Sequence, residues 1–341
     1  MERQPELQAT ERRSAPTPGP PAGDLHDQRP LLGRRSLWLD LLVYPTHSLP
    51  TAVAPVLVGL GLAVRHGVLR PWPALLGLVG SWAIHVAGVV TDNHELLRRH
   101  PGLGEHPELE AALSEGRLTL RHLRLAAAGS VALALLCAPP LLIIGGWPVL
   151  LLGVLGLVAS LSYAAGPLAY ARLGLADPIF LALFGAVAPA ATLFIQVAAA
   201  RGPGAAGLDG LRALPAEAWL VGLPVGAVVV AVMLVDDLRD AAFDARKAWR
   251  TGTVRFGAGF TRLEARLLVG AATLAPLALA ALPGSGPWLL LPLLTAPLAW
   301  RLMRAIGVDR RADLVPLSPR LAGLALLQAA LLAVGLALTP T

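Results

Sequence analysis

Acidic residues recur at regular intervals where one long apolar run of the chain ends. Asp236, Asp240 and Asp244 are four residues apart. If the segment is helical, this spacing places the three carboxylates on one face. Like charges stacked in this way repel by about 0.2–0.5 kcal/mol per pair in water. Such a face is typical of a site that holds a cation.

A second acidic group follows an earlier apolar run, where Asp92 and Glu95 are three residues apart. If both runs cross a membrane, the two groups form two carboxylate walls at the same membrane depth. Hard oxygen ligands suit Mg²⁺, which bridges carboxylates to substrate phosphates, and no EF-hand-like loop favours calcium. The acids that we interpret as Mg²⁺ ligands are Asp92, Glu95, Asp236, Asp237, Asp240 and Asp244.

Basic residues in the same two segments have the charge needed to neutralise a diphosphate. The candidates are Arg98, Arg239, Lys247 and Arg250. A second interpretation remains open for individual arginines, because basic residues beside membrane helices also act as positive-inside anchors.

Histidine and tyrosine residues near the acids allow two interpretations each. His85 precedes Asp92 by seven residues, so it either lines the inner wall of the same pocket or bonds to a neighbouring helix. Tyr163 and Tyr170 flank Gly166-Pro167. They are either interfacial aromatics or π-faces that stabilise an allylic cation.

Composition indicates the elements that position these residues. Of 341 residues, 55% are hydrophobic and 15% charged, and the mean hydropathy is +0.63. Runs of about 20 apolar residues predict membrane-spanning helices, and no period-two alternation indicates a barrel, so we expect an all-α polytopic membrane protein. We predict nine spans, with eight or ten as alternatives: 47–65, 72–91, 123–142, 147–166, 177–199, 217–236, 263–283, 286–304 and 319–338.

The basic residues predict the orientation. Only Arg65, Arg70, Arg201 and Arg212 fall on one side of the predicted topology, and every other Lys and Arg falls on the other. This asymmetry predicts an integral protein of the cell inner or plasma membrane, with the N-terminus and both acidic segments cytoplasmic. No aromatic-studded basic module indicates nucleic-acid binding, despite a pI of about 10.5.

The remaining features concern domain organisation. Residues 1–30 are polar and Pro-rich and are predicted to be a disordered tail, whereas 31–341 form one transmembrane domain beginning with an interfacial helix near Leu31–Tyr44. The single cysteine, Cys137, excludes an intramolecular disulfide, and His94, His100 and His106 match no zinc spacing.

Several patches resemble the UbiA superfamily of intramembrane prenyltransferases, and most closely its menaquinone branch, the 1,4-dihydroxy-2-naphthoate prenyltransferases. Ser48 to Gly59 resembles that branch's first helix. Asp236 to Asp240, Asp244, Arg250-Thr251 and Val254 to Gly257 resemble its second acidic loop. In the first loop, Thr91 and Glu95 stand where the family has Asn and Asp. Asp236 and Asp237 replace an Asn pair in the second.

The resemblance implies Mg²⁺-dependent transfer of a prenyl group from a polyprenyl diphosphate to an aromatic acceptor, with a quinone precursor such as 1,4-dihydroxy-2-naphthoate as first choice. It implies catalytic roles for Tyr163 and Tyr170. The alternatives are another acceptor, a non-catalytic membrane protein that binds prenyl lipids, and, from a different class, a transporter. The sequence predicts neither the prenyl chain length nor the oligomeric state.

Overall fold

The computed structural model describes residues 48–307 and 311–339, and every secondary-structure element within them is helical. The predicted tail and interfacial helix lie outside the described residues. The all-α prediction is therefore confirmed for the described part of the chain.

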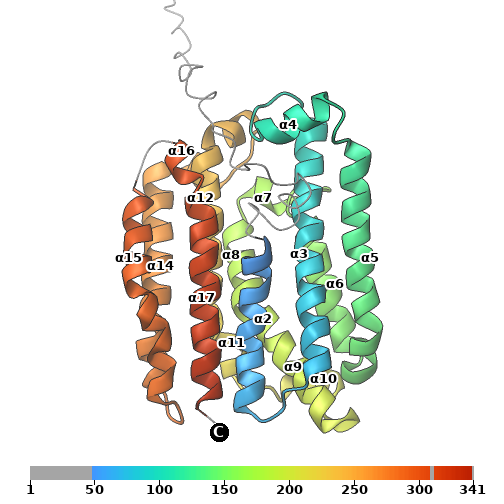
Figure 1. Cartoon of the computed structure of the whole chain (residues 1–341), viewed down its shortest axis with the longest axis vertical. Coiled ribbons are helices and arrows are strands. Elements are labelled where there is room, and N and C mark those ends of the chain that lie inside the picture. The colour runs from blue at the N-terminus through green and yellow to red at the C-terminus, as the bar shows by residue number, and fades with distance from the viewer. Residues whose placement is uncertain (1–47, 308–310, 340–341) are drawn as a thin grey trace, which may run out of the picture.

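The helices form one elongated bundle (Figure 1). The long elements are α2 (Ser48–Arg65), α3 (Pro71–Arg99), α5 (Leu120–Gly145), α6 (Trp147–Leu161), α9 (Ala188–Arg201), α12 (Leu223–Arg246), α14 (Ala258–Ala280), α15 (Ala296–Ala305) and α17 (Leu317–Ala337). The short elements are α4 (Pro107–Ser114), α7 (Tyr170–Leu173), α8 (Ala176–Phe180), η2 (Leu181–Val187), η3 (Pro203–Ala205), α10 (Gly207–Arg212), α11 (Glu217–Leu220), α13 (Gly252–Phe256), η4 (Pro287–Thr295) and α16 (Arg311–Leu314).

Six described helical segments are long and apolar enough to cross a membrane, and α2 and α6 are shorter apolar helices. Helical segments occupy each of the nine predicted spans. Length and composition support six of them, so the count of nine stays a prediction.

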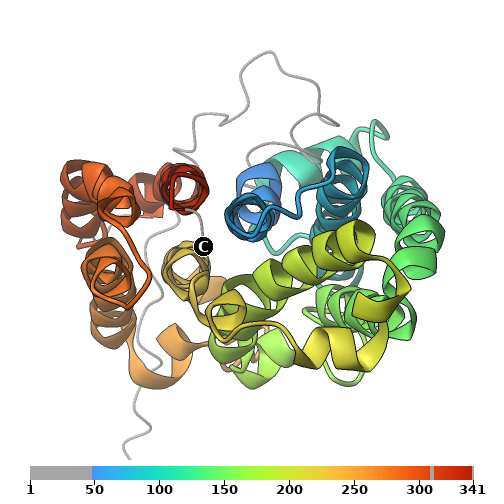
Figure 2. The same cartoon turned by 90° about the horizontal axis from the view of Figure 1, so that it is seen from below.

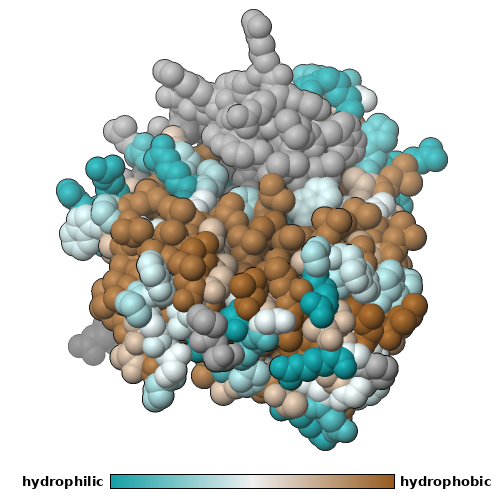
Figure 3. Space-filling model, turned by 60° about the horizontal axis from the view of Figure 1, so that its bottom comes forward, coloured by the Kyte–Doolittle hydropathy of each residue, from teal (hydrophilic) through white to brown (hydrophobic). Residues whose placement is uncertain are grey.

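The outer surface has the polarity that a lipid bilayer requires. A broad apolar belt crosses the face in Figure 3, with polar side chains above and below it. Leu136 and Ile143 of α5 are 75% and 84% exposed, which in water would be unfavourable for a row of large apolar side chains. The chain is therefore an integral membrane protein.

Glycines bring helix α2 close to its neighbours. A Cβ atom on Gly59 would lie 2.6 Å from the carbonyl oxygen of Pro189 in α9, and one on Gly61 would lie 2.6 Å from Cα of Ala333 in α17. Small residues at such contacts allow helix backbones to pack tightly inside a membrane. Helix α2 thus lies between the two sides of the bundle (Figure 2).

Helices α3 and α12 continue well beyond the predicted ends of their spans, and both extend at the same end of the molecule. Helix α3 continues from the predicted end near residue 91 to Arg99, and α12 continues from 236 to Arg246. The first acidic pair and the Asp236–Asp244 series are therefore helical, as the spacing argument required. Both lie near α4, at the upper end of Figure 1.

Candidate active site

A cavity of about 510 Å³ opens between the helices and runs from the acidic end toward the opposite end of the bundle. Its mouth is polar, with Asp92, Glu105, Asp236 and Arg239 among the lining residues. Its inner end is lined by apolar side chains and glycines from the far ends of α3, α5, α6 and α9, including Leu76, Gly77, Leu141, Val149 and Ile195. The volume is in the range of small-molecule sites.

The second acidic wall is held by an arginine on the same helix. Arg239 donates from Nη1 to Asp236 Oδ1 at 2.5 Å and from Nε to both carboxylate oxygens of Asp240 at 3.0 Å. Asp236 also accepts a hydrogen bond from Ser318 Oγ of α17 at 2.6 Å. These bonds fix the orientation of both carboxylates while Asp236 faces the cavity.

Lys247 connects the two acidic segments. Its Nζ lies 3.1 Å from Asp244 Oδ1 and 2.7 Å from Glu105 Oε2, and its side chain is 2% exposed. Burial raises the pKa of Glu105 to about 7, the carboxylates of Asp240 and Asp92 act in the same direction, and Lys247 opposes them. Burial acts to lower the pKa of Lys247, but Glu105 and Asp244 hold it above its usual range.

The first acidic pair is divided by the structure. Asp92 lines the cavity, lies within electrostatic range of Asp236, Asp240 and Asp244, and forms no hydrogen bond or ion pair within the described part of the chain. Glu95 points elsewhere and accepts from Arg98 at 2.7 Å and Arg99 at 2.6 Å. Asp92 thus faces the second wall, whereas Glu95 belongs to a surface ion-pair group.

The Gly166-Pro167 turn brings the two predicted tyrosines together. The backbone N–H groups of Tyr170 and Ala171 donate to the carbonyls of Ser162 and Tyr163 at 3.1 Å, and the rings of Tyr163 and Tyr170 meet edge to face at 5.7 Å. Both rings line the cavity.

The remaining predicted residues lie outside the main cavity. Asp237 lines a small neighbouring pocket of about 10 Å³ with Asp177 and Thr251. Arg98 and Arg250 are exposed, and the backbone N–H of Arg250 donates to the carbonyl of Arg172 at 3.0 Å. The structure therefore brings Asp92, Asp236, Arg239, Tyr163 and Tyr170 to the cavity, with Asp240, Asp244 and Lys247 directly behind them.

Sequence reasoning missed four residues of the site: Glu105, Ser318, Phe180 and Phe184. One sequence feature could have identified Glu105 as a site residue, because it is an acidic residue in the loop that follows Asp92. No sequence feature could have identified Ser318, since its role depends on the packing of α17 against α12. Phe184 lies in the π-helical η2, a form that often marks functional sites.

The donor set of the mouth fits Mg²⁺ bound together with a phosphorylated substrate. Among the described residues, no group of three or more His, Cys, Asp or Glu is arranged to hold a metal by itself. Mg²⁺ commonly uses one or two carboxylates and completes its shell with waters and phosphate oxygens. Asp92 and Asp236, from facing helices, supply such a pair.

Comparison with known proteins agrees with this geometry. The model of the UbiA prenyltransferase family matches residues 52–315, which include both acidic walls and every lining residue of the cavity except Thr51 and Pro319. The chain belongs to the UbiA prenyltransferase family. It is therefore a prenyltransferase, and the resemblance drawn from the sequence patches is confirmed.

Two bacterial relatives in this family are 1,4-dihydroxy-2-naphthoate octaprenyltransferases. The one from Mycobacterium tuberculosis is 30% identical over 292 residues, covering 84% of this chain and 92% of that protein. The one from Escherichia coli is 27% identical over 298 residues, covering 85% and 90%.

Solved structures of the family share the fold. A UbiA homologue from Aeropyrum pernix K1 superposes with a TM-score of 0.58 at 18% identity, covering 82% of this chain and 94% of that one. A homologue from Archaeoglobus fulgidus bound to GPP and Mg²⁺ gives a TM-score of 0.50 at 17% identity, covering 87% and 99%.

Proposed function

We propose that the protein transfers a prenyl group from a polyprenyl diphosphate to an aromatic acceptor in a Mg²⁺-dependent reaction. The observation that carries the proposal is the cavity itself, with facing carboxylates at its mouth, tyrosines below them and an apolar inner end. This order matches the three parts of an allylic diphosphate: the charged head, the reacting carbon and the hydrocarbon tail.

Charge at the mouth supports a metal-bound donor. The buried carboxylates around Asp240 outnumber the two cations paired with them, Arg239 and Lys247. A diphosphate without a bound cation would be repelled there. Asp92 and Asp236 would hold Mg²⁺, with Asp240 and Asp244 supporting them, and the metal would supply Lewis-acid stabilisation of the leaving diphosphate.

The chain's own residues have separate tasks in this proposal. Arg239 binds a diphosphate oxygen by exchanging one of its carboxylate partners for phosphate. Tyr163 and Tyr170 present neutral π-faces to the allylic cation formed when the C1–O bond breaks. The surrounding bundle excludes water that would otherwise trap the cation.

The proposed acceptor is a quinone precursor, with 1,4-dihydroxy-2-naphthoate as the first candidate. It is the substrate in the names of both relatives above, which align with most of this chain. The proposal also includes nine spans and an orientation with the N-terminus and acidic mouth on the cytoplasmic side, supported by the basic residues that flank α3, α5 and α12.

The experiment is transfer of radiolabelled geranylgeranyl diphosphate in membranes that contain the protein, with 1,4-dihydroxy-2-naphthoate and other aromatic acceptors. Asp240→Ala is expected to abolish Mg²⁺-dependent transfer. Glu115→Gln is the matched control, because Glu115 pairs with Arg117 on the surface, where both side chains are 56% exposed. Donor binding without transfer to any acceptor would favour a lipid-binding role instead.

A further inference from the structure

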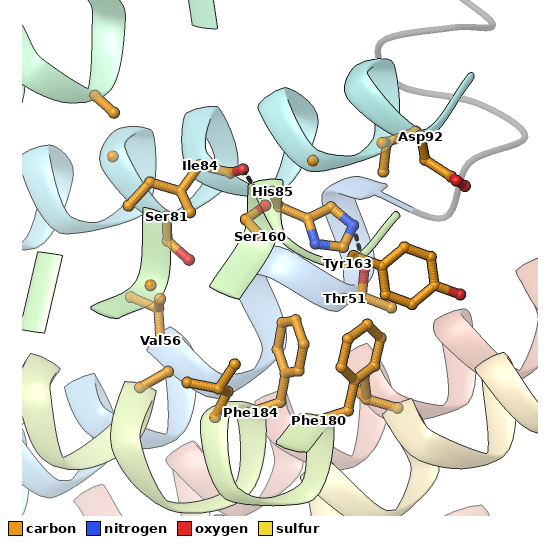
Figure 4. Close-up of a pocket in the computed structure, with 18 of the residues that line it drawn as sticks. Thr51, Val56, Ser81, Ile84, His85, Asp92, Ser160, Tyr163, Phe180 and Phe184 are labelled. Atoms are coloured by element: carbon orange, nitrogen blue, oxygen red, sulfur yellow. Dashed lines mark hydrogen bonds between the residues drawn. The ribbon is translucent and has the colours of Figure 1, made fainter. Parts of the chain in front are cut away.

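A histidine lies in the middle of the cavity, between the acidic mouth and the apolar end. His85 is two turns of α3 from Asp92, a rise of about 10 Å, and its ring lines the cavity. Its Nε2 shares a hydrogen bond of 3.1 Å with Thr51 Oγ1 of α2 (Figure 4). Both sequence interpretations of His85 are therefore correct, since it lines the pocket and bonds to a neighbouring helix.

His85 ends a continuous row of aromatic rings that line the cavity. Ring centroids are 5.7 Å apart for Tyr170 and Tyr163, 5.6 Å for Tyr163 and Phe180, 5.3 Å for Phe180 and Phe184, and 6.0 Å for Phe184 and His85. Figure 4 shows the two phenylalanine rings pointing toward His85 and Tyr163. A flat aromatic ligand placed along this row of rings would have the cation-stabilising tyrosines at one end and an imidazole at the other.

The neighbouring hydroxyls of the cavity already donate to backbone. Ser81 Oγ donates to the carbonyl of Ala52 at 3.1 Å, and Ser160 Oγ donates to that of Ile84 at 2.7 Å. Exchanging either bond for a ligand would leave a carbonyl without a partner at membrane depth. The His85–Thr51 bond joins two side chains, so a ligand hydroxyl can enter it without that penalty.

The charges of the cavity lining favour binding of a ligand hydroxyl, rather than a ligand carboxylate, beside His85. Among the described lining residues, the only Lys or Arg is Arg239, which lies at the mouth between Asp236 and Asp240. A neutral imidazole has one nitrogen that accepts a hydrogen bond and one that donates, so it can bind a phenolic hydroxyl. Polar groups held inside a membrane bundle commonly mark substrate sites.

We propose that His85, with Thr51, binds the phenolic hydroxyl of the aromatic acceptor and takes its proton, an inference that rests on the proposed prenyl transfer. As the C1–O bond of the donor breaks, its electron pair leaves with diphosphate. The ring π-electrons form the new C–C bond to C1 while the phenolic proton moves to His85 Nε2. The attacked ring carbon then loses its hydrogen as a proton to diphosphate, and the imidazolium returns its proton to the oxygen.

The test separates hydroxyl recognition from transfer. The full-length protein in lipid nanodiscs, without donor or metal, is titrated with 1-naphthol and with 1-methoxynaphthalene, and ligand fluorescence reports binding. Wild type is expected to prefer naphthol by about tenfold, the effect of one good buried hydrogen bond. His85→Leu and Thr51→Val, on different helices, should each reduce the preference to below about threefold.

The matched control is His122→Leu, because His122 is exposed on α5 outside the cavity and its loss should leave the preference unchanged. His85→Gln, which keeps a hydrogen-bonding group without a basic nitrogen, should retain the preference and lower naphthol turnover about tenfold or more, with a changed pH profile. Thermal unfolding of each variant checks that it is folded.

Retention of the naphthol preference in both His85→Leu and Thr51→Val would overturn the inference and leave the pair as an interhelical contact. A His85-dependent preference in a wild-type protein that transfers no prenyl group would support the hydroxyl subsite and contradict the proposed function. The two failures are therefore distinguishable.

Discussion

The two acidic walls of the cavity have similar sequences and different structures. In the second wall, each of the three aspartates Asp236, Asp240 and Asp244 pairs with a basic side chain beside the cavity, either that of Arg239 or that of Lys247. A serine of helix α17 donates a further hydrogen bond to Asp236. In the first wall, Asp92 alone faces the cavity, while Glu95 pairs with surface arginines. Three- and four-residue spacings both keep helical side chains on one face, so the ion pairs with Arg98 and Arg99 account for the different direction of Glu95.

The largest expected effect is the contrast within the first wall. Asp92→Asn should lower kcat/KM for the prenyl donor by about 100-fold or more, because it removes a carboxylate that faces the diphosphate site. Glu95→Gln should lower it by less than about threefold. Initial rates of labelled prenyl transfer measure both effects. Equal losses of kcat/KM in the two variants would contradict the difference that we infer between Asp92 and Glu95.

Loss of a carboxylate from the second wall is expected to lower the affinity for Mg²⁺. Asp240→Asn weakens the orientation of Arg239 and of the neighbouring carboxylates, so the Mg²⁺ concentration for half-maximal transfer should rise by about 10- to 100-fold. Titration of activity with Mg²⁺ measures this shift. An unchanged Mg²⁺ dependence would exclude Asp240 from the metal site.

The connection between the walls predicts a smaller effect, on stability. Glu105→Gln removes one of the two carboxylates that pair with the buried side chain of Lys247, and Asp244 remains as the other. We therefore expect the variant to lose about 1–3 kcal/mol of unfolding free energy. Thermal unfolding in detergent at fixed lipid content tests this. Glu115→Gln, from a pair with both side chains 56% exposed, serves as the control and should unfold at the wild-type temperature.

The smallest effect is expected at the surface group of the first wall. Arg98 is 46% exposed and its partner Glu95 retains Arg99, so Arg98→Ala should change transfer by less than about twofold. Arg239→Ala in parallel should be far more damaging. A large loss in Arg98→Ala would show that Arg98 binds the diphosphate, as its position in the sequence predicted.

Local features of the site were predictable where they depend on one helix. The spacing of Asp240 and Asp244 predicted a shared face, because this follows from helix geometry. The contact between Tyr163 and Tyr170 was not predicted, although the Gly166-Pro167 turn between them is a local feature. The all-helical membrane fold followed from the apolar runs.

Contacts between distant elements were not predictable from the sequence. Glu105 meets Lys247 across 142 positions, and Ser318 meets Asp236 across 82, so both contacts depend on how the helices pack. The direction of Glu95 is set by its competition between two arginines and the cavity. Spacing alone does not decide such a balance.

The most direct test of the central claim is calorimetric binding of an unreactive allylic diphosphate analogue, geranyl S-thiolodiphosphate, with and without Mg²⁺. We predict micromolar binding that requires Mg²⁺, falls by at least about tenfold in Asp92→Asn and is unchanged in Glu95→Gln. Equal binding without Mg²⁺, or binding that Asp92→Asn leaves intact, would contradict a metal–diphosphate site between the two acidic walls.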